Sequence, residues 1–378
     1  MSLILWPGNA MSWRDYRARI AIALWAAVFV LLAPAAYHLY SYVPAQAEEI
    51  ACYPEFNPEY YDEESYEAQY LVVEQEFREN LASSEDSSAQ LMSIRVENNG
   101  RVGADEIDVL AELAQRAPES GLVVSQLLAA CLQDPGRSEC SSDSVNTLVQ
   151  SHSNNSAIWG SLAMLRNEQE DIFGAISALR QAAVAPEFDD YFSLQVAVID
   201  QANPTAEPLA KMGTAFRFFS YSDPTVGTSS AGPSIWNLCS QQASVDPLAA
   251  EGCLLYGERI AEGSDTNIGK ILGLAVQQGV YQAIGDEDGV ARMEAALEAR
   301  QEYQNQFRSP AMSLMSYDEE LADFWINSLI EHGEVETMER LHNEVQRLTA
   351  NPEYQPCDPP GLRFDYPYFY IGDERVIW

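Results

Sequence analysis

Apolar residues recur every three or four positions through most of the chain, which is the spacing of one face of an α-helix. The first clear runs contain Ile107, Leu110, Leu113 and Ala114, and then Leu122, Leu127, Leu128 and Cys131. Later runs cover Ile235–Gln242, Pro247–Ala261, Thr266–Ile284, Asp288–Phe307, Asp318–His332 and Val335–Ala350. Short polar turns separate neighbouring runs, so the pattern predicts an all-α chain built from helix hairpins.

The segment Ser156–Pro186, SAIWGSLAMLRNEQEDIFGAISALRQAAVAP, has two helical stretches joined around Glu168–Asp171. Small residues on these helices would let the pair approach closely, and large apolar residues would fill the space between neighbouring hairpins. These positions are Trp159, Leu162, Ala163, Ala175, Leu179 and Ala182. With Pro186 they resemble the tetratricopeptide repeat, whose pattern is W-x2-L-G followed by Ala, Phe, Ala and Pro. Arg166 departs from this pattern, because the repeat has an aromatic residue there.

A second repeat is expected immediately upstream. One repeat length earlier, about 34 residues, the chain has the apolar residues Leu128, Ala129 and Val145. The resemblance therefore covers about Leu122 to Pro186, and it is only generic for the other helix pairs. It implies a tetratricopeptide-like solenoid, in which stacked hairpins form a concave groove that binds a peptide or protein.

Changes in composition divide the chain into segments. Residues 1–47 are expected to be a signal anchor or signal peptide, and residues 48–104 an acidic, Tyr-rich stalk with a first helix. Residues 105–219 would hold the repeats, 220–234 a Gly/Ser/Pro-rich linker, and 235–350 a second set of helical hairpins. Residues 351–378 form a Pro- and aromatic-rich tail, which either covers one end of the helices or presents a patch for a partner.

The N-terminal region carries an export pattern. An uncharged stretch, Ile20–Ala36, follows Arg14, Arg17 and Arg19, and no further Lys or Arg occurs before Arg78. This arrangement predicts a single-pass anchor in the inner membrane with the rest of the chain in the periplasm. The small-x-small sequence Ala45–Ala47 is also compatible with signal cleavage, which would leave a periplasmic or secreted protein. Both alternatives export the bulk of the chain.

Six cysteines fit an oxidising compartment, because all of them follow the apolar segment. They are Cys52, Cys131, Cys140, Cys239, Cys253 and Cys357. Connectivity does not follow from sequence alone. Pairing of nearest neighbours would join Cys131 to Cys140 and Cys239 to Cys253, and would leave Cys52 for Cys357.

The charge balance restricts the partners. The chain has 57 Asp and Glu against 21 Lys and Arg, a net charge of −36. Such a chain repels nucleic-acid phosphates, so nucleic acid is excluded as a partner, and a basic protein or peptide is favoured. The acidic residues also repel one another, and salt screens this repulsion, which suggests that the protein functions in a saline medium.

Motifs for catalysis, cofactors or metals are not found in the sequence. His332 precedes Gly333 at an expected helix C-terminus, where capping explains both residues. His332 and His342 could meet with Glu331 or Glu339, but they lack the spacing of a metal site. We therefore predict no catalytic, cofactor-binding or metal-ligating residues.

These observations lead to one expected function and two alternatives. We expect a non-enzymatic envelope protein that acts as an interaction module or scaffold, held at the membrane by its N-terminal helix. It would bind an unknown protein or peptide in the helical groove. The alternatives are an enzyme or enzyme subunit without a local motif, and a purely structural envelope protein. A deep pocket that collected His332, His342 and several carboxylates would favour the enzyme.

Overall fold

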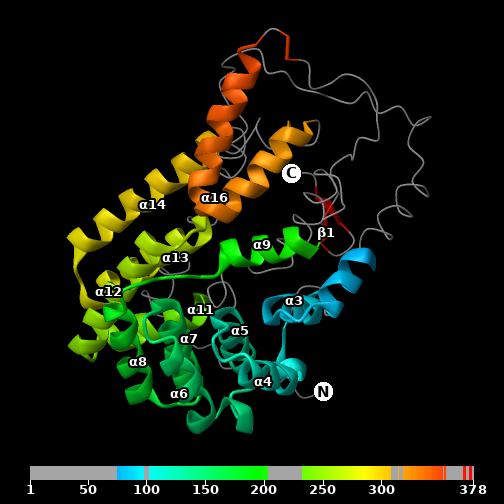
Figure 1. The fold of residues 1–378 in the computed structure, drawn as a ribbon. Coiled ribbons are helices and arrows are strands. Elements are labelled where there is room, and N and C mark those ends of the chain that lie inside the picture. The colour runs from blue at the N-terminus through cyan, green and yellow to red at the C-terminus, as the bar shows by residue number, and fades with distance from the viewer. Residues whose placement is uncertain are drawn as a thin grey trace, which may run out of the picture. The chain divides into compact units, whose positions relative to one another are not determined.

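The computed structural model describes residues 75–97, 102–202, 232–307, 314, 318–351 and 353–354, and the backbone of 369–371 and 374–376. Of the two compact units of the chain, Met1–Ile50 and Ala51–Trp378, all of these residues belong to the second. Its described core is all-α (Figure 1). The early helices are 75–83, α3 (Ser87–Glu97), η1 (Ala104–Glu106), α4 (Ile107–Arg116), α5 (Gly121–Cys131), η2 (Ser138–Cys140) and α6 (Ser142–Ser151). The later ones are α7 (Ser156–Glu168), α8 (Ile172–Val184), α9 (Phe192–Ala202), α11 (Gly232–Ala243), α12 (Pro247–Gly263), α13 (Asn267–Ile284), α14 (Glu287–Phe307) and α16 (Glu319–Thr349).

Polar residues at the N-terminal ends explain where several helices begin. The side chain of Asn155 accepts a hydrogen bond from the backbone of α7, and Asp171, Asp246, Thr266 and Asp318 do the same for α8, α12, α13 and α16. Each side chain satisfies a backbone N–H that has no partner within the helix. The predicted boundaries of these helices therefore agree closely with the structure.

Gly333 interrupts α16 at the predicted position. Its φ of 71° and ψ of 179° lie outside the helical region and are accessible mainly to glycine. The break separates the two helical stretches that the sequence predicts, up to His332 and from Val335 onward. Gly285 ends α13 with a φ of 76°, which is again a conformation that suits glycine.

One hydrophobic core joins most of the helices. It contains residues of α3 to α8 and of α11 to α13. Within it α5 packs on α7, α7 on α8, α8 on α12 and α12 on α13, and α14 then packs on α13. The helices before and after the expected linker therefore share a single core. Residues 232–234, expected in the linker, form the first turn of α11.

Two smaller cores surround α9. On one side Phe192 and Val196 pack with α16 residues, among them Trp325 and Leu329. On the other side Val198 and Ile199 pack with α3 and with helix 75–83. Helix α9 thus leaves the stack of hairpins and connects two other parts of the fold.

The C-terminal tail contains a short antiparallel ladder of β1 (Phe369–Ile371) and β2 (Glu374–Val376), in which Phe369 lies opposite Val376. Among the described helices, none is long and apolar enough to cross a membrane. The predicted anchor Ile20–Ala36, the stalk up to residue 70, and Cys52 and Cys357 all lie outside the described residues.

Candidate functional site

Two disulfides tie helix hairpins together. Cys131 at the end of α5 is bonded to Cys140, two residues before α6, and their Cα atoms are 5.6 Å apart. Cys239 of α11 is bonded to Cys253 of α12, with a Cα separation of 5.7 Å. These are the two nearest-neighbour pairs expected from the sequence. All four cysteines are fully buried.

The six predicted repeat-packing residues lie in the main core. Ala163, Ala175, Leu179 and Ala182 are 0% exposed, and Trp159 and Leu162 are below 10%. The indole N–H of Trp159 donates to the carbonyl oxygen of Ser153 at 3.0 Å, which fixes the ring at the start of α7. The small side chains let α7 and α8 form one of the most extensive helix contacts in the chain.

Arg166, which departs from the repeat pattern, joins α7 to the preceding hairpin. Its guanidinium donates to Asn146 Oδ1 at 2.8 Å and to Ser142 Oγ, both on α6, and to Gln169 Oε1 at 3.3 Å. The residue is only 6% exposed. A polar link to α6 therefore occupies the place where the repeat has an aromatic contact.

Helix α7 is enclosed on all sides. Every residue from Ser156 to Arg166 is buried, and α5, α6, α8, α11 and α12 all contact the helix. The ring of Tyr256 on α12 covers Gly160 so closely that a Cβ there would lie 1.8 Å from the Tyr256 hydroxyl oxygen. The groove that the repeat resemblance implies is therefore closed along α7.

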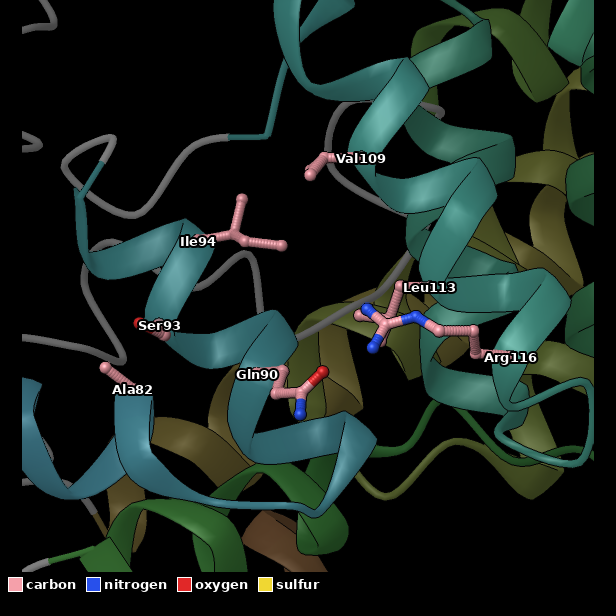
Figure 2. Close-up of a pocket in the computed structure, with 7 residues that line it drawn as sticks. All are labelled: Ala82, Gln90, Ser93, Ile94, Val109, Leu113 and Arg116. Atoms are coloured by element: carbon pink, nitrogen blue, oxygen red, sulfur yellow. The ribbon is translucent and has the colours of Figure 1, made fainter.

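An open cleft of about 170 Å³ lies between helix 75–83, α3 and α4. Figure 2 shows Ile94 and Val109 pointing toward one another across it, with Arg116 extending toward Gln90. Its lining residues are Ala82, Gln90, Ser93, Ile94, Val109, Leu113 and Arg116. This lining combines four apolar residues with the polar side chains of Gln90 and Ser93 and the cation of Arg116, and it contains no carboxylate, thiol or imidazole.

His332 and His342 take separate partners on either side of the break in α16. His332 lies 3.4 Å from a carboxylate oxygen of Glu331 and 3.5 Å from one of Glu336. His342 Nε2 lies 2.8 Å from the side-chain amide nitrogen of Gln346. In the part of the chain that the structure describes, no group of three or more His, Cys, Asp or Glu side chains is placed to hold a metal ion.

A buried polar junction links the α8–α9 connection to the turn between α12 and α13. Asp190 is 1% exposed. Its Oδ2 accepts from the Ser264 hydroxyl at 2.7 Å, and its Oδ1 from the backbone N–H of Phe192 at 3.2 Å. The Ser264 hydroxyl also lies 3.1 Å from Oγ1 of Thr266, the capping residue of α13.

The same turn is bonded to α14 and α16. The carbonyl oxygen of Asp265 accepts from the backbone N–H of Val335 at 3.2 Å, just beyond the Gly333 break. The backbone N–H of Asn267 donates to a carboxylate oxygen of Glu334 at 2.7 Å, and Arg300 Nε donates to Asn267 Oδ1. One short turn therefore holds parts of the stack and of α16 together.

The junction carries unusual electrostatics. Burial raises the pKa of Asp190 from 3.8 to about 7, although the Ser264 hydrogen bond favours the ionised form. Burial also raises the pKa of Asp189 and of Asp265, and it lowers the pKa of Lys270. Sequence reasoning did not single out these residues, because no local motif distinguishes Asp189 and Asp190 among 57 acidic residues.

Comparison with known proteins assigns the chain to no family. No protein-family model matches the chain, and searches of curated proteins and of solved structures find no significant match. The likeness to the tetratricopeptide repeat thus depends on the residue pattern around α7 and α8 alone.

Proposed function

We propose that the chain is a non-enzymatic interaction module, built from tetratricopeptide-like helix hairpins, that binds a basic segment of another envelope protein. The observation that supports this proposal is the order of packing, in which α5, α7, α8, α12 and α13 each contact the next within one core. Stacked hairpins of this kind offer long helical faces, and such faces are used for binding proteins and peptides.

The contact surface would be an outer acidic face, since α7 is enclosed. Helix α14 suits this role, because its packing within the described residues is with α13 and, to a small extent, α16. Glu287, Glu294, Glu298 and Glu302 are exposed and are spaced as on one face of the helix. Because the chain carries a net charge of −36, a basic partner would be attracted to this face and an acidic one repelled.

The proposed location is the periplasmic side of the inner membrane, with the N-terminal apolar segment as anchor. The two disulfides support an oxidising compartment. The positive flank before Ile20–Ala36 supports export of the residues that follow it. If the segment is cleaved, the same module would be periplasmic or secreted.

A peptide-selection experiment tests the proposal. The full-length chain, purified in detergent, is offered a random peptide library, and the affinity of the selected peptides is measured by fluorescence anisotropy at low and high salt. We expect enrichment of a defined Lys/Arg-containing sequence whose binding weakens with salt. Changing Glu294, Glu298 and Glu302 to Gln should weaken that binding by roughly tenfold.

A matched triple variant serves as control. Glu251, Glu258 and Glu262 are exposed on α12, and their change to Gln removes the same charge elsewhere on the surface. Their substitution should leave the affinity within about twofold of the unaltered chain. Selection of no defined sequence would refute the interaction module. Equal losses in both triple variants would show that binding depends on overall charge and would refute the assignment to α14.

A further inference from the structure

The α8–α9 connection is the place where the chain leaves the stacked hairpins. Asp189 and Asp190 precede α9, which packs with α16 and α3 in the two smaller cores. Tyr191 follows with a φ of 58°, a conformation that non-glycine residues seldom adopt. Its hydroxyl accepts from Asn155 Nδ2 at 2.9 Å, which holds the connection against the start of α7. Any movement of α9 relative to the main core must therefore act on this connection.

Asp190 faces the α12–α13 turn with more negative than positive charge around it. No ion pair of Asp190 with a basic side chain occurs in the described ranges. Two cations lie nearby: Lys270 Nζ donates to the carbonyl oxygens of Ala261 and Glu262, and Arg300 donates to Asn267. The carboxylates of Asp265 and Asp190 also attract Lys270, although burial still lowers the pKa of Lys270. The charged or titratable groups on the surrounding elements are Glu187, Asp189 and Tyr191 of the connection, Glu262 of α12, Asp265 of the turn, Lys270 of α13, Arg300 of α14, Glu334 of α16 and Arg95 of α3.

Both protonation states of Asp190 can satisfy their hydrogen bonds. When the carboxyl is ionised, the Ser264 hydroxyl donates to it at 2.7 Å. When it is protonated, it can donate to the Ser264 oxygen, and the Ser264 hydroxyl can turn to the Thr266 carbonyl oxygen at 3.4 Å. Loss of the proton therefore changes the charge of the junction and leaves its bonding pattern intact. The added charge lies in a buried place beside Asp189 and Asp265.

We propose that Asp190 is a proton-dependent latch, which holds α9 to the α12–α13 turn when its carboxyl is protonated and loosens this contact when the carboxyl is ionised. The latch controls the position of α9 and α16 relative to the main core. It is separate from the proposed binding face, since Glu294, Glu298 and Glu302 of α14 take no part in the contact between Asp190 and Ser264.

The direction of the pH effect on this contact follows from the burial of Asp190. The pKa of its carboxyl is about 7 in the closed junction, against an ordinary value of 3.8 that applies once the junction opens to water. Between these two values, opening becomes about tenfold more favourable for each pH unit. Above about pH 7 both states are ionised, so the effect levels off.

Hydrogen exchange of the full-length chain measures how often the contact between α9 and the α12–α13 turn opens. Exchange is followed by mass spectrometry at pH 5, 6, 7 and 8, and the rates are corrected for the pH dependence of chemical exchange. Peptides from α9 and from the α12–α13 turn should lose at least about tenfold in protection between pH 5 and 7. Peptides from α7, which is buried throughout, should stay better protected than those of α9 at every pH, because they exchange only when the whole unit unfolds.

Substitutions at the junction separate the latch from general instability. Asp190→Asn keeps the shape but cannot ionise, so α9 should stay protected at every pH. Asp143→Asn, at an exposed position on α6, should behave as the unaltered chain. Asp265→Asn removes a neighbouring negative charge and should lower the pKa of Asp190 in the closed junction, so the loss of protection should level off at lower pH and be smaller at pH 8 than in the unaltered chain. This variant also tests the latch if Asp190→Asn does not fold.

Three results would overturn the proposal. The first is equal protection of α7 and α9 at every pH, because α9 would then open only when the whole unit unfolds. The second is an α9 profile that keeps its pH dependence in Asp190→Asn. The third is an Asp265→Asn variant whose transition does not move.

Discussion

Gly273 of α13 allows a direct approach to α12. A Cβ at this position would lie 2.4 Å from the backbone nitrogen of Ala261 and 2.5 Å from the carbonyl oxygen of Gly257. Both are backbone atoms of α12, so neither can move away without displacing the helix. The change Gly273→Ala therefore forces α12 and α13 apart, in one of the most extensive helix contacts of the main core.

The expected loss of stability in Gly273→Ala is the balance of two effects. Overpacking of a well-packed core costs about 1–3 kcal/mol, and the rigid neighbours place Gly273→Ala at the upper end of that range. Alanine is more favourable than glycine within a helix by about 1 kcal/mol, which offsets part of the loss. The net destabilisation should be about 2 kcal/mol.

Urea unfolding of the full-length chain, followed by near-ultraviolet circular dichroism, measures this loss. Gly252→Ala on α12 is the matched control, since its Cβ would meet Arg180 Cγ, part of a flexible side chain, at 3.4 Å. That variant should be as stable as the unaltered chain or slightly more stable. If Gly273→Ala were as stable as Gly252→Ala, the close packing of α12 and α13 would be refuted.

Three further outcomes are expected. Removal of the Cys131–Cys140 disulfide by a double change to Ala should lower the free energy of unfolding by about 2–3 kcal/mol, measured in urea without reductant, because the closed loop is short. Asp190 should make the chain less stable as pH rises. Its pKa is raised on folding, so this destabilisation is absent below about pH 4 and complete above about pH 7, with a ceiling of about 4 kcal/mol. In urea titrations at pH 5 and 8, the difference between Asp190→Asn and the unaltered chain should therefore grow with pH, and a constant difference would contradict this. Thermal melting should shift upward with added NaCl, since salt screens the net charge of −36, and an unchanged midpoint would rule out self-repulsion.

The sequence predicts the helix hairpins well where apolar spacing and capping residues agree. Asp246 before Pro247 and Thr266 before Asn267 fix the starts of α12 and α13, and both caps are formed in the structure. Nearest-neighbour pairing of cysteines succeeds for the two described disulfides because each pair is separated by one short turn. In these places local signals and tertiary packing favour the same structure.

The sequence pattern does not reveal α3 and α9. Helix α3 buries Ser88 and Arg95 together with its apolar residues, so its buried face has no continuous apolar stripe in the sequence. Arg95 is buried because its guanidinium donates to Gln195 of α9 at 2.9 Å, a contact between residues far apart in the chain. The closed surface of α7 and the junction at Asp190 have the same origin, since both depend on α12, which no local pattern places beside α7 or α8.

The place of α12 explains why the repeat resemblance ends after α8. In a regular array the next helix along the chain would pack on α8, yet here that position belongs to α12, and α9 is directed elsewhere. The change of direction occurs at Asp189–Tyr191, where the Tyr191 hydroxyl approaches Gly121 of α5 so closely that a Cβ there would lie 1.9 Å away. The end of the repeat-like pattern and the titratable junction therefore coincide, because the segment that turns α9 away from α8 is also the segment that buries Asp190 against Ser264.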